Sequence, residues 1–425
     1  MEQSSPIYQA CCRLLQDELQ MATGCTEPIA LAYAAAFCRA TLGAMPERVA
    51  AAISGSIVKN VAGVAVPGTG GRKGIEAAIA AGILVGNERA GLEALHDTPE
   101  HADALIEEYL AAHSVSVSLS ESGYLFDIDV ICAAGSDEAE VRIAGHHTNV
   151  VLVRRNREIL RQEPLSCAEP GSLDAEDLNI REIFEFACEC ALEDVAPVIE
   201  KQIACNAALS EEGLRHPWGA CIGRTLLDST ENVDTLLLAK ARAAAGSDAR
   251  MSGCEMPAVI NSGSGNQGIT ITLPVVTYAE ALGSSREELI RALVLANLSA
   301  VRIKKSIGCL SAYCGAICAG CAAGAGIAFL HERNRSLVEH AIVNGLAILS
   351  GTICDGAKPS CAAKIAMSVE AGVLGFRMAA AGREFRGGEG IFKKGIENTI
   401  REVGRLGRDG MAHTNEVILG IMMEK

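Results

Sequence analysis

The sequence predicts an α+β protein that is predominantly helical, with a small antiparallel-sheet unit in its N-terminal half and an all-helical C-terminal domain. Hydrophobic residues make up 49% of the chain and aromatic residues only 4%, so Ala, Leu, Ile and Val supply the bulk and favour close helix packing. Period-two alternation, which is typical of strands, appears only between residues 115 and 155. Because 425 residues exceed one ordinary core, we expect two domains, 1–165 and 175–425.

The helical pattern at the start of the chain is interrupted twice. Residues 6–43 predict two helices that break at Thr23-Gly24, and residues 45–90 continue the helical pattern around a glycine-rich stretch at 66–74. A further helix is expected at 98–112. Strand alternation is found at 115–119, 124–131, 140–143 and 149–155.

A polar stretch separates the two predicted domains. Residues 163–176 carry Pro164, Pro170 and Gly171, which predicts a linker. The segments that follow are predicted to be amphipathic helices over 177–250, a glycine-rich loop between β-branched runs over 257–276, and mainly helices from residue 279 onward.

Charge and cysteine content exclude several classes of function. The net charge of −15 argues against nucleic acid and against an anionic membrane surface, because both need clustered Lys and Arg. The first twenty residues lack the apolar run of a secretory signal, so a cytoplasmic protein is expected. Its 17 cysteines are then kept reduced, and metal-binding or catalytic roles are favoured over disulfides.

Residues 309–330 have the pattern of a membrane-spanning helix, because they contain no charged residue and are long enough to cross a bilayer. Most of them are Gly, Ala, Ser or Cys, whose transfer into lipid is only weakly favourable. Lys304 and Lys305 before the segment are balanced by Arg333 and Arg335 after it, so no positive-inside bias appears. A helix buried on all sides in a soluble core is the better interpretation, and we expect no membrane partner.

Cys25 lies at the predicted start of a helix. Thr26 is a good N-cap and Pro28 suits the first helical turn. A thiol at a helix N-terminus has its pKa lowered by the helix dipole. The residues alone leave three roles open for this thiol, namely a base, a nucleophile or an inert neighbour of the cap.

The glycine-rich stretch Val66–Gly74 contains Gly68, Thr69 and Gly70. Its glycines permit close backbone approach, and the following helix offers amides to an anion. The stretch lacks the Gly-Lys-Ser/Thr ending of a nucleotide-binding loop. A small carboxylate is therefore a better ligand than a nucleotide, and a plain loop stays an equal alternative.

A second glycine-rich segment covers residues 261–268. It contains G-x-G-x-x-G, but neither a helix start nor a βαβ unit is predicted around it, which argues against a dinucleotide site. Its polar side chains are suited to binding the ammonium and carboxylate groups of an amino acid; they are Asn261, Ser262, Ser264 and Asn266.

Three cysteines of the C-terminal third resemble an incomplete ligand set. The spacing of Cys354 and Cys361 predicts a turn that points both sulfurs at one object, and Cys314 comes from a separate helix, where Cys318 and Cys321 compete with it. Thiolates select iron–sulfur clusters or zinc, and a closed zinc site needs four ligands. A cluster with three cysteine ligands keeps one iron open as a Lewis acid. Small core residues are the alternative.

Taken together, the motifs resemble the L-cysteine desulfidase family, which is related to the α-chain domain of iron–sulfur L-serine dehydratases. They are Gly24-Cys-Thr-Glu-Pro28, Pro67-Gly-Thr-Gly70, residues 261–268, Tyr313-Cys-Gly-Ala316 and residues 354–361, in the family's order over nearly the whole chain. The resemblance implies an oxygen-sensitive [4Fe-4S] enzyme that needs no pyridoxal phosphate and converts L-cysteine to pyruvate, sulfide and ammonia.

The resemblance also implies roles for individual residues. Cys314, Cys354 and Cys361 fall on the cluster-ligand positions and Cys25 on the proposed base that removes the Cα proton, while Lys358 or Lys364 assists. The segments that would bind the substrate supply Thr26, Glu27, Gly68, Thr69, Gly70, Asn261, Ser262, Gly263, Ser264 and Asn266, together with Lys358.

Two departures from the serine dehydratase branch favour the desulfidase branch. The chain has Cys25-Thr-Glu-Pro28 where that branch has a Ser-rich motif ending in His-Thr, and its last two predicted ligands are closer together. L-Serine or L-threonine dehydration by the same cluster chemistry is the alternative. A membrane transporter and a catalytically silent metal-storage protein are the rivals from other classes. A homodimer is left open.

Overall fold

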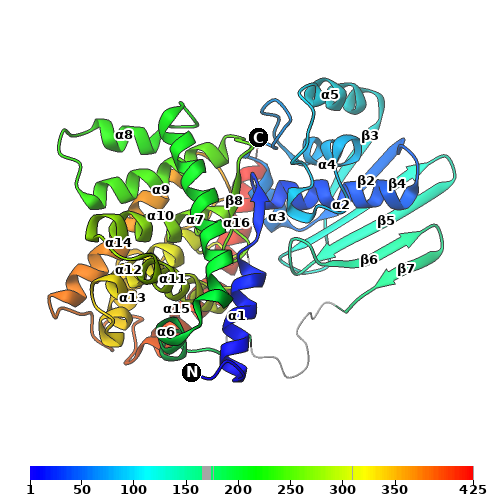
Figure 1. Ribbon diagram of the computed structural model, residues 1–425. Helices are drawn as coiled ribbons and strands as arrows, with labels where there is room; N and C mark the ends of the chain where they lie inside the picture. Colours follow the sequence, from blue (N-terminus) through cyan, green and yellow to red (C-terminus); the bar gives the residue numbers. More distant parts are fainter. Residues whose placement is uncertain (165–173, 176, 309, 425) are drawn as a thin grey trace.

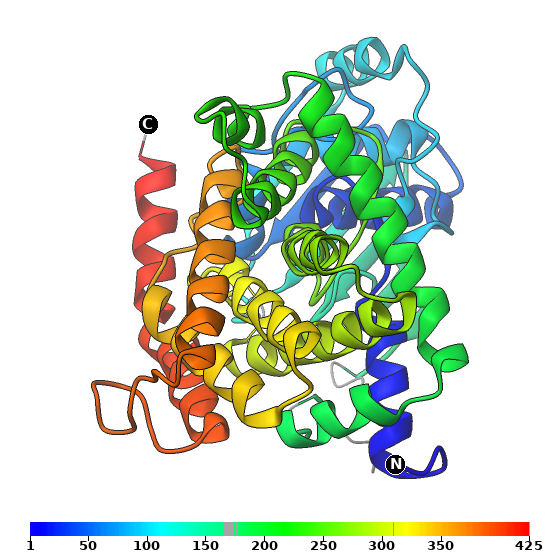
Figure 2. The same ribbon diagram turned by 60° about the vertical axis from the view of Figure 1, so that its left-hand side comes forward.

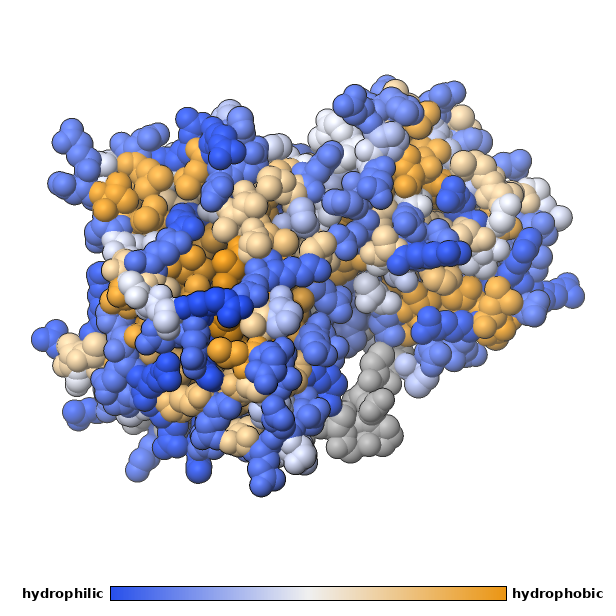
Figure 3. Space-filling model, in the orientation of Figure 1, coloured by the Kyte–Doolittle hydropathy of each residue, from blue (hydrophilic) through white to orange (hydrophobic). Residues whose placement is uncertain are grey.

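The computed structural model describes residues 1–164, 174–175, 177–308 and 310–424, and it confirms an α+β fold that is mostly helical. A mixed unit of helices and a sheet forms one lobe, and a helical assembly forms the other (Figure 1). The space-filling view in the same orientation shows the two lobes side by side (Figure 3). Each lobe has its own cluster of buried hydrophobic residues. The predicted division at 1–165 and 175–425 stays a prediction, and most of the predicted linker lies outside the described residues.

The N-terminal lobe is built on a six-stranded sheet in the order β3-β2-β4-β5-β6-β7. Helix α2 packs against β4 and β5, where the Cys38 thiol donates to the carbonyls of Val130 and Ala139. The remaining helices pack around α2 and the β3 edge (Figure 1). The elements are α2 (Thr26–Leu42), β2 (Arg48–Ile53), α3 (Gly55–Val61), α4 (Ile75–Val85), η1 (Gly91–Glu93), α5 (Ala102–Ala112), β3 (Ser114–Leu119), β4 (Asp127–Ala134), β5 (Asp137–Ala144), β6 (Val150–Arg155) and β7 (Glu158–Gln162).

The helical prediction for 45–90 is wrong at β2, which lies between β3 and β4 and pairs with β3 in parallel. The sheet is therefore mixed, with one parallel pair among antiparallel ones, rather than antiparallel throughout. Val49, Ala51 and Ile53 alternate inward along β2, but Ala50 and Ala52 between them are also apolar and hide the period-two pattern. Strand β7 was also not predicted, because all its residues are exposed at the sheet edge.

Two carboxylates on β4 are expected to affect stability in opposite directions. Burial raises the pKa of Asp127, but hydrogen bonds from Arg142, Ser120 and Ser122 outweigh it and hold the pKa below its usual value. A lowered pKa stabilises the fold above the unfolded-state value of about 4, and that stability is lost as the pH falls. Asp127→Asn should lower the free energy of unfolding at pH 7 by about 3 kcal/mol, measured by urea denaturation.

Asp129 provides the matched variant. Burial and the neighbouring charge of Glu140 raise its pKa to about 6, so its ionised form destabilises the fold at neutral pH. Asp129→Asn should therefore raise the melting temperature at pH 7, and the gain should shrink as the pH falls below 6. Equal effects of the two substitutions would contradict this assignment.

The second lobe is a helical assembly around α10, whose residues are buried almost throughout. Figure 2 views α10 nearly along its axis, with α7, α9, α11 and α12 packed around it. The elements are α6 (Ile180–Glu189), α7 (Leu192–Arg215), α8 (Ile222–Asp228), α9 (Thr235–Met251), β8 (Pro257–Val259), α10 (Gly265–Leu282), α11 (Arg286–Ile307), α12 (Gly315–His331), α13 (Arg335–Leu349), α14 (Cys361–Ala380), α15 (Ile396–Arg405), η2 (Leu406–Gly410) and α16 (Ala412–Met423).

The loop predicted over 257–276 is wrong, because α10 begins inside the glycine-rich segment, at Gly265. Its β-branched residues suggested strands, yet burial on every side makes packing decide over propensity. The hydroxyls of Thr270, Thr272 and Thr277 each donate to the carbonyl four residues earlier, which satisfies them inside the helix. The absence of a βαβ unit is confirmed, since β8 pairs antiparallel with β1.

The N-terminal segment joins the two lobes. Helix α1 (Pro6–Glu18) contributes Tyr8 and Leu15 to the buried cluster of the helical lobe, and β1 (Met21–Thr23) pairs with β8 before the chain enters α2. The C-terminal lobe is thus not purely helical. Next to this junction the buried ammonium of Lys59 donates to Asn415 of α16 at 2.6 Å and to the carbonyl of Cys354 at 3.2 Å.

The charge-free stretch 309–330 forms the loop before α12 and the body of α12, apart from residue 309, which is not described. Within the described ranges, no helix has the length and apolar character that crossing a membrane requires. The prediction of a fully buried helix is confirmed for α12, and its glycines let α14 approach closely: a Cβ on Gly320 or Gly324 would lie 2.3 Å from a carbonyl oxygen of α14.

Candidate active site

A cavity of about 120 Å³ lies where the two lobes meet, and both lobes supply its walls. The N-terminal lobe contributes Cys25, Thr26 and Glu27 at the start of α2, Asn60 of α3, and His147 after β5. The helical lobe contributes residues 262–267, the end of α9, and the starts of α12 and α14. The volume is many times the roughly 15 Å³ that a single water needs, so a small polar molecule fits.

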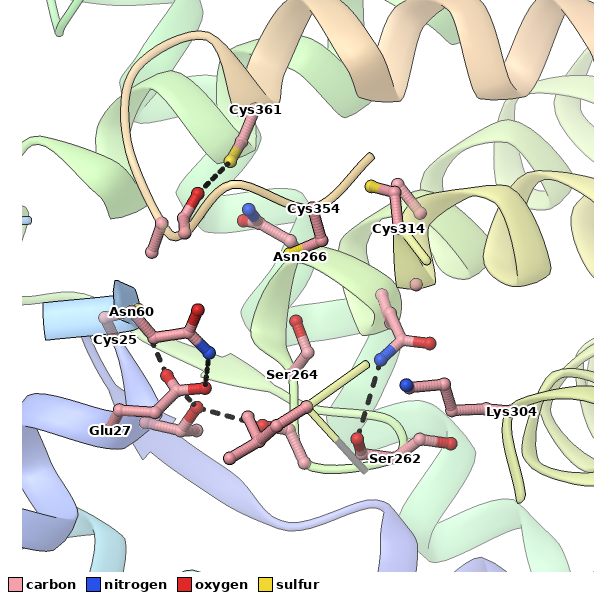
Figure 4. A pocket seen from close by; sticks show the side chains of 18 of the residues that line it. Cys25, Glu27, Asn60, Ser262, Ser264, Asn266, Lys304, Cys314, Cys354 and Cys361 are labelled. Atoms are coloured by element: carbon pink, nitrogen blue, oxygen red, sulfur yellow. Dashed lines mark hydrogen bonds between the residues drawn. The ribbon is translucent and has the colours of Figure 1, made fainter. Parts of the chain in front are cut away.

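The Glu27 carboxylate is the common hydrogen-bond acceptor of the N-terminal wall. Its carboxylate accepts hydrogen bonds from the Cys25 thiol at 3.6 Å, the Thr26 hydroxyl at 3.0 Å and the Asn60 amide at 2.9 Å. The Nε2 atom of His147 lies 3.9 Å from the other side of the carboxylate. Figure 4 shows Glu27 and Asn60 facing the cavity. The wall therefore connects a thiol, a carboxylate and an imidazole in sequence.

The electrostatics of Cys25 differ from the expectation. The thiol is the N-cap of α2, but it is only 3% exposed, and burial raises its pKa above the usual value. Arg250 opposes this shift, while the charge of Glu27 and the hydrogen bond to it add to it. The predicted lowering by the helix dipole is wrong, because the dipole at one helix end is weaker than desolvation beside a carboxylate.

Glu27 itself is ionised. Burial raises the pKa of its carboxyl group, but the charge of His147 and the hydrogen bond from the Asn60 amide outweigh it and hold the pKa at about 2. A buried carboxylate with these partners is a stable acceptor for the thiol hydrogen of Cys25.

Three cysteines line the opposite wall (Figure 4). Cys314 is the N-cap of α12 and Cys361 is the first residue of α14. The loop before α12 pairs with the loop after α13: the amide of Cys314 donates to Thr352 at 3.0 Å, and the amide of Cys354 donates to Ala312 at 2.6 Å. This short ladder sets Cys314 and Cys354 side by side.

Cys314 and the two cysteines that compete with it as a predicted ligand differ in where they lie. Cys318 and Cys321 are buried inside α12 among core residues and do not line the cavity, whereas Cys314 does. Burial raises the pKa of Cys314, and the thiols of Cys354 and Cys361 add to this shift, so the three sulfurs are electrostatic neighbours.

The donor set of this wall consists of thiols, and thiolates are the ligands that iron–sulfur clusters take. Among the described residues, no three Cys, His, Asp or Glu side chains converge closely enough to hold one metal ion. A [4Fe-4S] cluster held by Cys314, Cys354 and Cys361 alone would keep one iron free of a protein ligand.

The glycines of the 261–268 segment make room for polar side chains of the cavity. A Cβ on Gly263 would lie 2.7 Å from the His147 ring, and one on Gly265 would lie 2.3 Å from Nε of Arg250. The Gly263 carbonyl also accepts a hydrogen bond from Thr26 at 2.9 Å, which fixes the segment to the start of α2. Ser262, Ser264 and Asn266 line the cavity beside them.

Five residues of the predicted substrate set have other contacts and do not line the cavity. Asn261 is fully buried and donates to Asn297, and Lys358 pairs with Asp355 at 2.6 Å. The Thr69 hydroxyl donates to Val66, and the glycines beside it, Gly68 and Gly70, pack near Thr98 and Asp103. The 66–74 loop instead packs against the Cys25 turn, where Pro67 occupies the space that a Cβ on Gly24 would need.

Sequence reasoning missed polar residues that do line the cavity: Asn60, His147, Arg250, Gln267 and Lys304. Gln267 belongs to the 261–268 segment, but only other side chains of that segment were singled out. The remaining four stand among unrelated neighbours in the sequence, and no local spacing connects them to the cysteine motifs. The one available signal was a charged or amide residue in a buried helical segment, as for Arg250 in α9.

The geometry can be set beside known proteins. A family model described as the serine dehydratase alpha chain matches residues 92–420. The chain belongs to the serine dehydratase alpha-chain family. This is a family of iron–sulfur serine dehydratases, so the chain is of a lyase type. Cys314, Cys354 and Cys361 lie inside the matched region, and Cys25 precedes it.

Similar proteins match over all or nearly all of the chain. A UPF0597 protein of Desulfitobacterium hafniense is 47% identical over 100% of this chain and 99% of its own length. UPF0597 proteins of Finegoldia magna and Treponema denticola are 45% and 40% identical over 97% of this chain, covering 99% and 97% of their own lengths. The similarity to these relatives therefore includes the Cys25 wall.

Proposed function

We propose that this protein is an iron–sulfur-dependent lyase that eliminates sulfide from L-cysteine. The observation that carries the proposal is that Cys25 of one lobe and Cys314, Cys354 and Cys361 of the other line the same cavity. Loss of the Cα proton and of the β-thiolate gives hydrogen sulfide and 2-aminoacrylate. Water then converts the aminoacrylate to pyruvate and ammonia, which balances the reaction.

Cys314, Cys354 and Cys361 would hold the [4Fe-4S] cluster, which supplies a Lewis acid for the leaving group when bound. Lys364 lines the cavity next to them and is held by Asp355 and by the carbonyl of Ile353. The positive charge of Lys364 therefore lies beside the cysteine wall, where the thiolate of the substrate would leave.

Cys25 serves as the base that takes the Cα proton. Its thiol donates to Glu27, but this carboxylate, with a pKa of about 2, is too weak a base to take the thiol proton, so Cys25 must lose that proton to solvent before it can act. The charge of His147, behind Glu27, stabilises the carboxylate. The lobe interface keeps the thiol almost free of water contact.

L-Serine or L-threonine dehydration is the second candidate, favoured by the family's name. It uses the same residues, with hydroxide in place of sulfide as the leaving group. The replacement of the dehydratase Ser-rich motif by Cys25-Thr-Glu-Pro28 supports the desulfidase reaction.

Product analysis of anaerobically reconstituted protein tests the proposal. L-Cysteine should give pyruvate and sulfide in equal amounts, and faster than L-serine gives pyruvate. Turnover of serine with little turnover of cysteine would instead establish the dehydratase. The visible absorbance of the cluster should be lost in Cys354→Ala and Cys361→Ala and kept in Cys318→Ala, which removes a buried thiol outside the cavity.

A further inference from the structure

Arg250 is a buried cation that has no acidic partner among the residues that the structure describes. It lies in the last turn of α9, lines the cavity and is 2% exposed. Its Nη1 atom donates to Asn266 at 3.2 Å, while Nε and Nη2 have no hydrogen-bond partner among the described residues. A buried charge with unsatisfied donors destabilises a protein unless an anion pairs with it. The cavity is therefore suited to receive an anionic group.

The two unsatisfied donors of Arg250 have a defined shape. Nε and Nη2 form one edge of the planar guanidinium, with parallel N–H bonds that match the two oxygens of a carboxylate. Asn266 occupies the remaining side of the group, and Gly265 packs so close to Nε that a Cβ there would lie 2.3 Å away. The side chain is thus held in one orientation before any ligand binds.

Acceptors for a cation line the same cavity. The amide of Asn60 donates to Glu27 and that of Gln267 donates to the Ser262 carbonyl at 3.5 Å. In the described part of the chain no donor reaches Asn60 Oδ1 or Gln267 Oε1, and both oxygens are buried. Gln267 is held against Gly315, where a Cβ would lie 2.8 Å from its Cδ atom. Two lone acceptors and one carboxylate-shaped donor edge are complementary to an amino-acid zwitterion.

We infer that Arg250 binds the α-carboxylate of a free amino acid through Nε and Nη2, with Asn60 Oδ1 and Gln267 Oε1 accepting from its ammonium group. The inference takes from the proposed function only that the substrate is an amino acid. It assigns substrate recognition to isolated residues of α3, α9 and α10, and not to the amides of the glycine-rich loops.

This placement is consistent with the rest of the cavity. Met251, the residue after Arg250, packs in one buried cluster with Cys25, and Cys361 packs against that cluster. Arg250 lines the same cavity as Cys25 and its charge acts on the thiol, so a carboxylate held by Arg250 would place the attached Cα on the Cys25 side of the cavity, with the side chain of the amino acid free to extend toward the cysteine wall.

Binding of two unreactive probes tests the inference. L-Alanine has both charged groups but no leaving group, and L-alaninamide lacks only the carboxylate. Calorimetry on the full-length, anaerobically reconstituted protein should show L-alanine binding and L-alaninamide binding much more weakly. In Arg250→Met, L-alanine affinity should fall by at least about 30-fold, which removes the preference over the amide. In Arg250→Lys, which keeps the positive charge but loses the two parallel N–H donors, the affinity for L-alanine should fall about 10-fold.

Arg242→Met is the matched control, since Arg242 is on the same helix and pairs with Glu280 away from the cavity. It should keep the wild-type preference. An unchanged preference in Arg250→Lys or Arg250→Met would overturn the inference, as would wild-type protein that binds both probes equally. Loss of cluster absorbance in Arg250→Lys with unchanged L-alanine affinity would also overturn it. If L-alanine binding depends on Arg250 but the protein releases no sulfide from L-cysteine, the proposed function is wrong while the inference about Arg250 stands.

Discussion

Replacing Gly372 by alanine is expected to prevent stable folding of the helical lobe. Gly372 lies on α14 where this helix crosses α12, and a Cβ there would lie 1.9 Å from the carbonyl oxygen of Gly320. The clashing atom belongs to the backbone of a buried helix, so no side-chain rotation relieves the contact. The helices must separate, and the free energy of unfolding should fall by at least about 3 kcal/mol.

The same crossing fixes the cysteine wall, because α12 begins beside Cys314 and α14 begins at Cys361. Any protein of this variant that folds should therefore take up less cluster, which visible absorbance measures together with the melting temperature. Gly420→Ala is the control, since Gly420 lies in α16 with nothing within 4 Å of its added Cβ. That change should stabilise by about 0.5–1 kcal/mol. Equal effects of both changes would show that the crossing is loose.

The fold class and the pairing of Cys354 with Cys361 followed from the sequence because both depend on local pattern. Cys354 and Cys361 share one turn, and a turn of that length brings its two ends together whatever surrounds it. The buried character of α12 followed from its lack of charge and its small residues. The strands between residues 115 and 155 could be predicted because apolar and polar residues alternate along them, since one face of the sheet is buried.

The parts that could not be predicted depend on contacts distant in sequence. Strand β2 has an inner and an outer face that are both apolar, and only its position between β3 and β4 decides its conformation. His147 and Arg250 reach the cavity because glycines at 263 and 265 leave room for them, a relation that spans more than a hundred residues in the first case. The rise in the pKa of Cys25 likewise reflects burial by the other lobe, which a helix-start pattern does not reveal.

Removing the Cys25 thiol is expected to have the largest effect on catalysis. Cys25→Ala should reduce kcat for sulfide release by about 10³-fold, because a positioned general base typically contributes 10²- to 10⁴-fold. The cluster absorbance should stay, since Cys25 lies on the wall opposite the three cysteines (Figure 4). Glu27→Gln removes the charge that raises the pKa of Cys25 and keeps the shape of the acceptor, so it should change kcat far less than Cys25→Ala and leave the cluster intact.

The control must separate loss of a base from loss of a buried thiol. Cys38 is on the same helix, is fully buried and donates to two carbonyls of the sheet without lining the cavity. Cys38→Ala should lower the melting temperature through its lost packing and hydrogen bonds and leave kcat near the wild-type value. If Cys25→Ala instead matches Cys38→Ala, with lower stability and nearly full turnover, then Cys25 is a packing residue and the base must be sought elsewhere on the Glu27 wall.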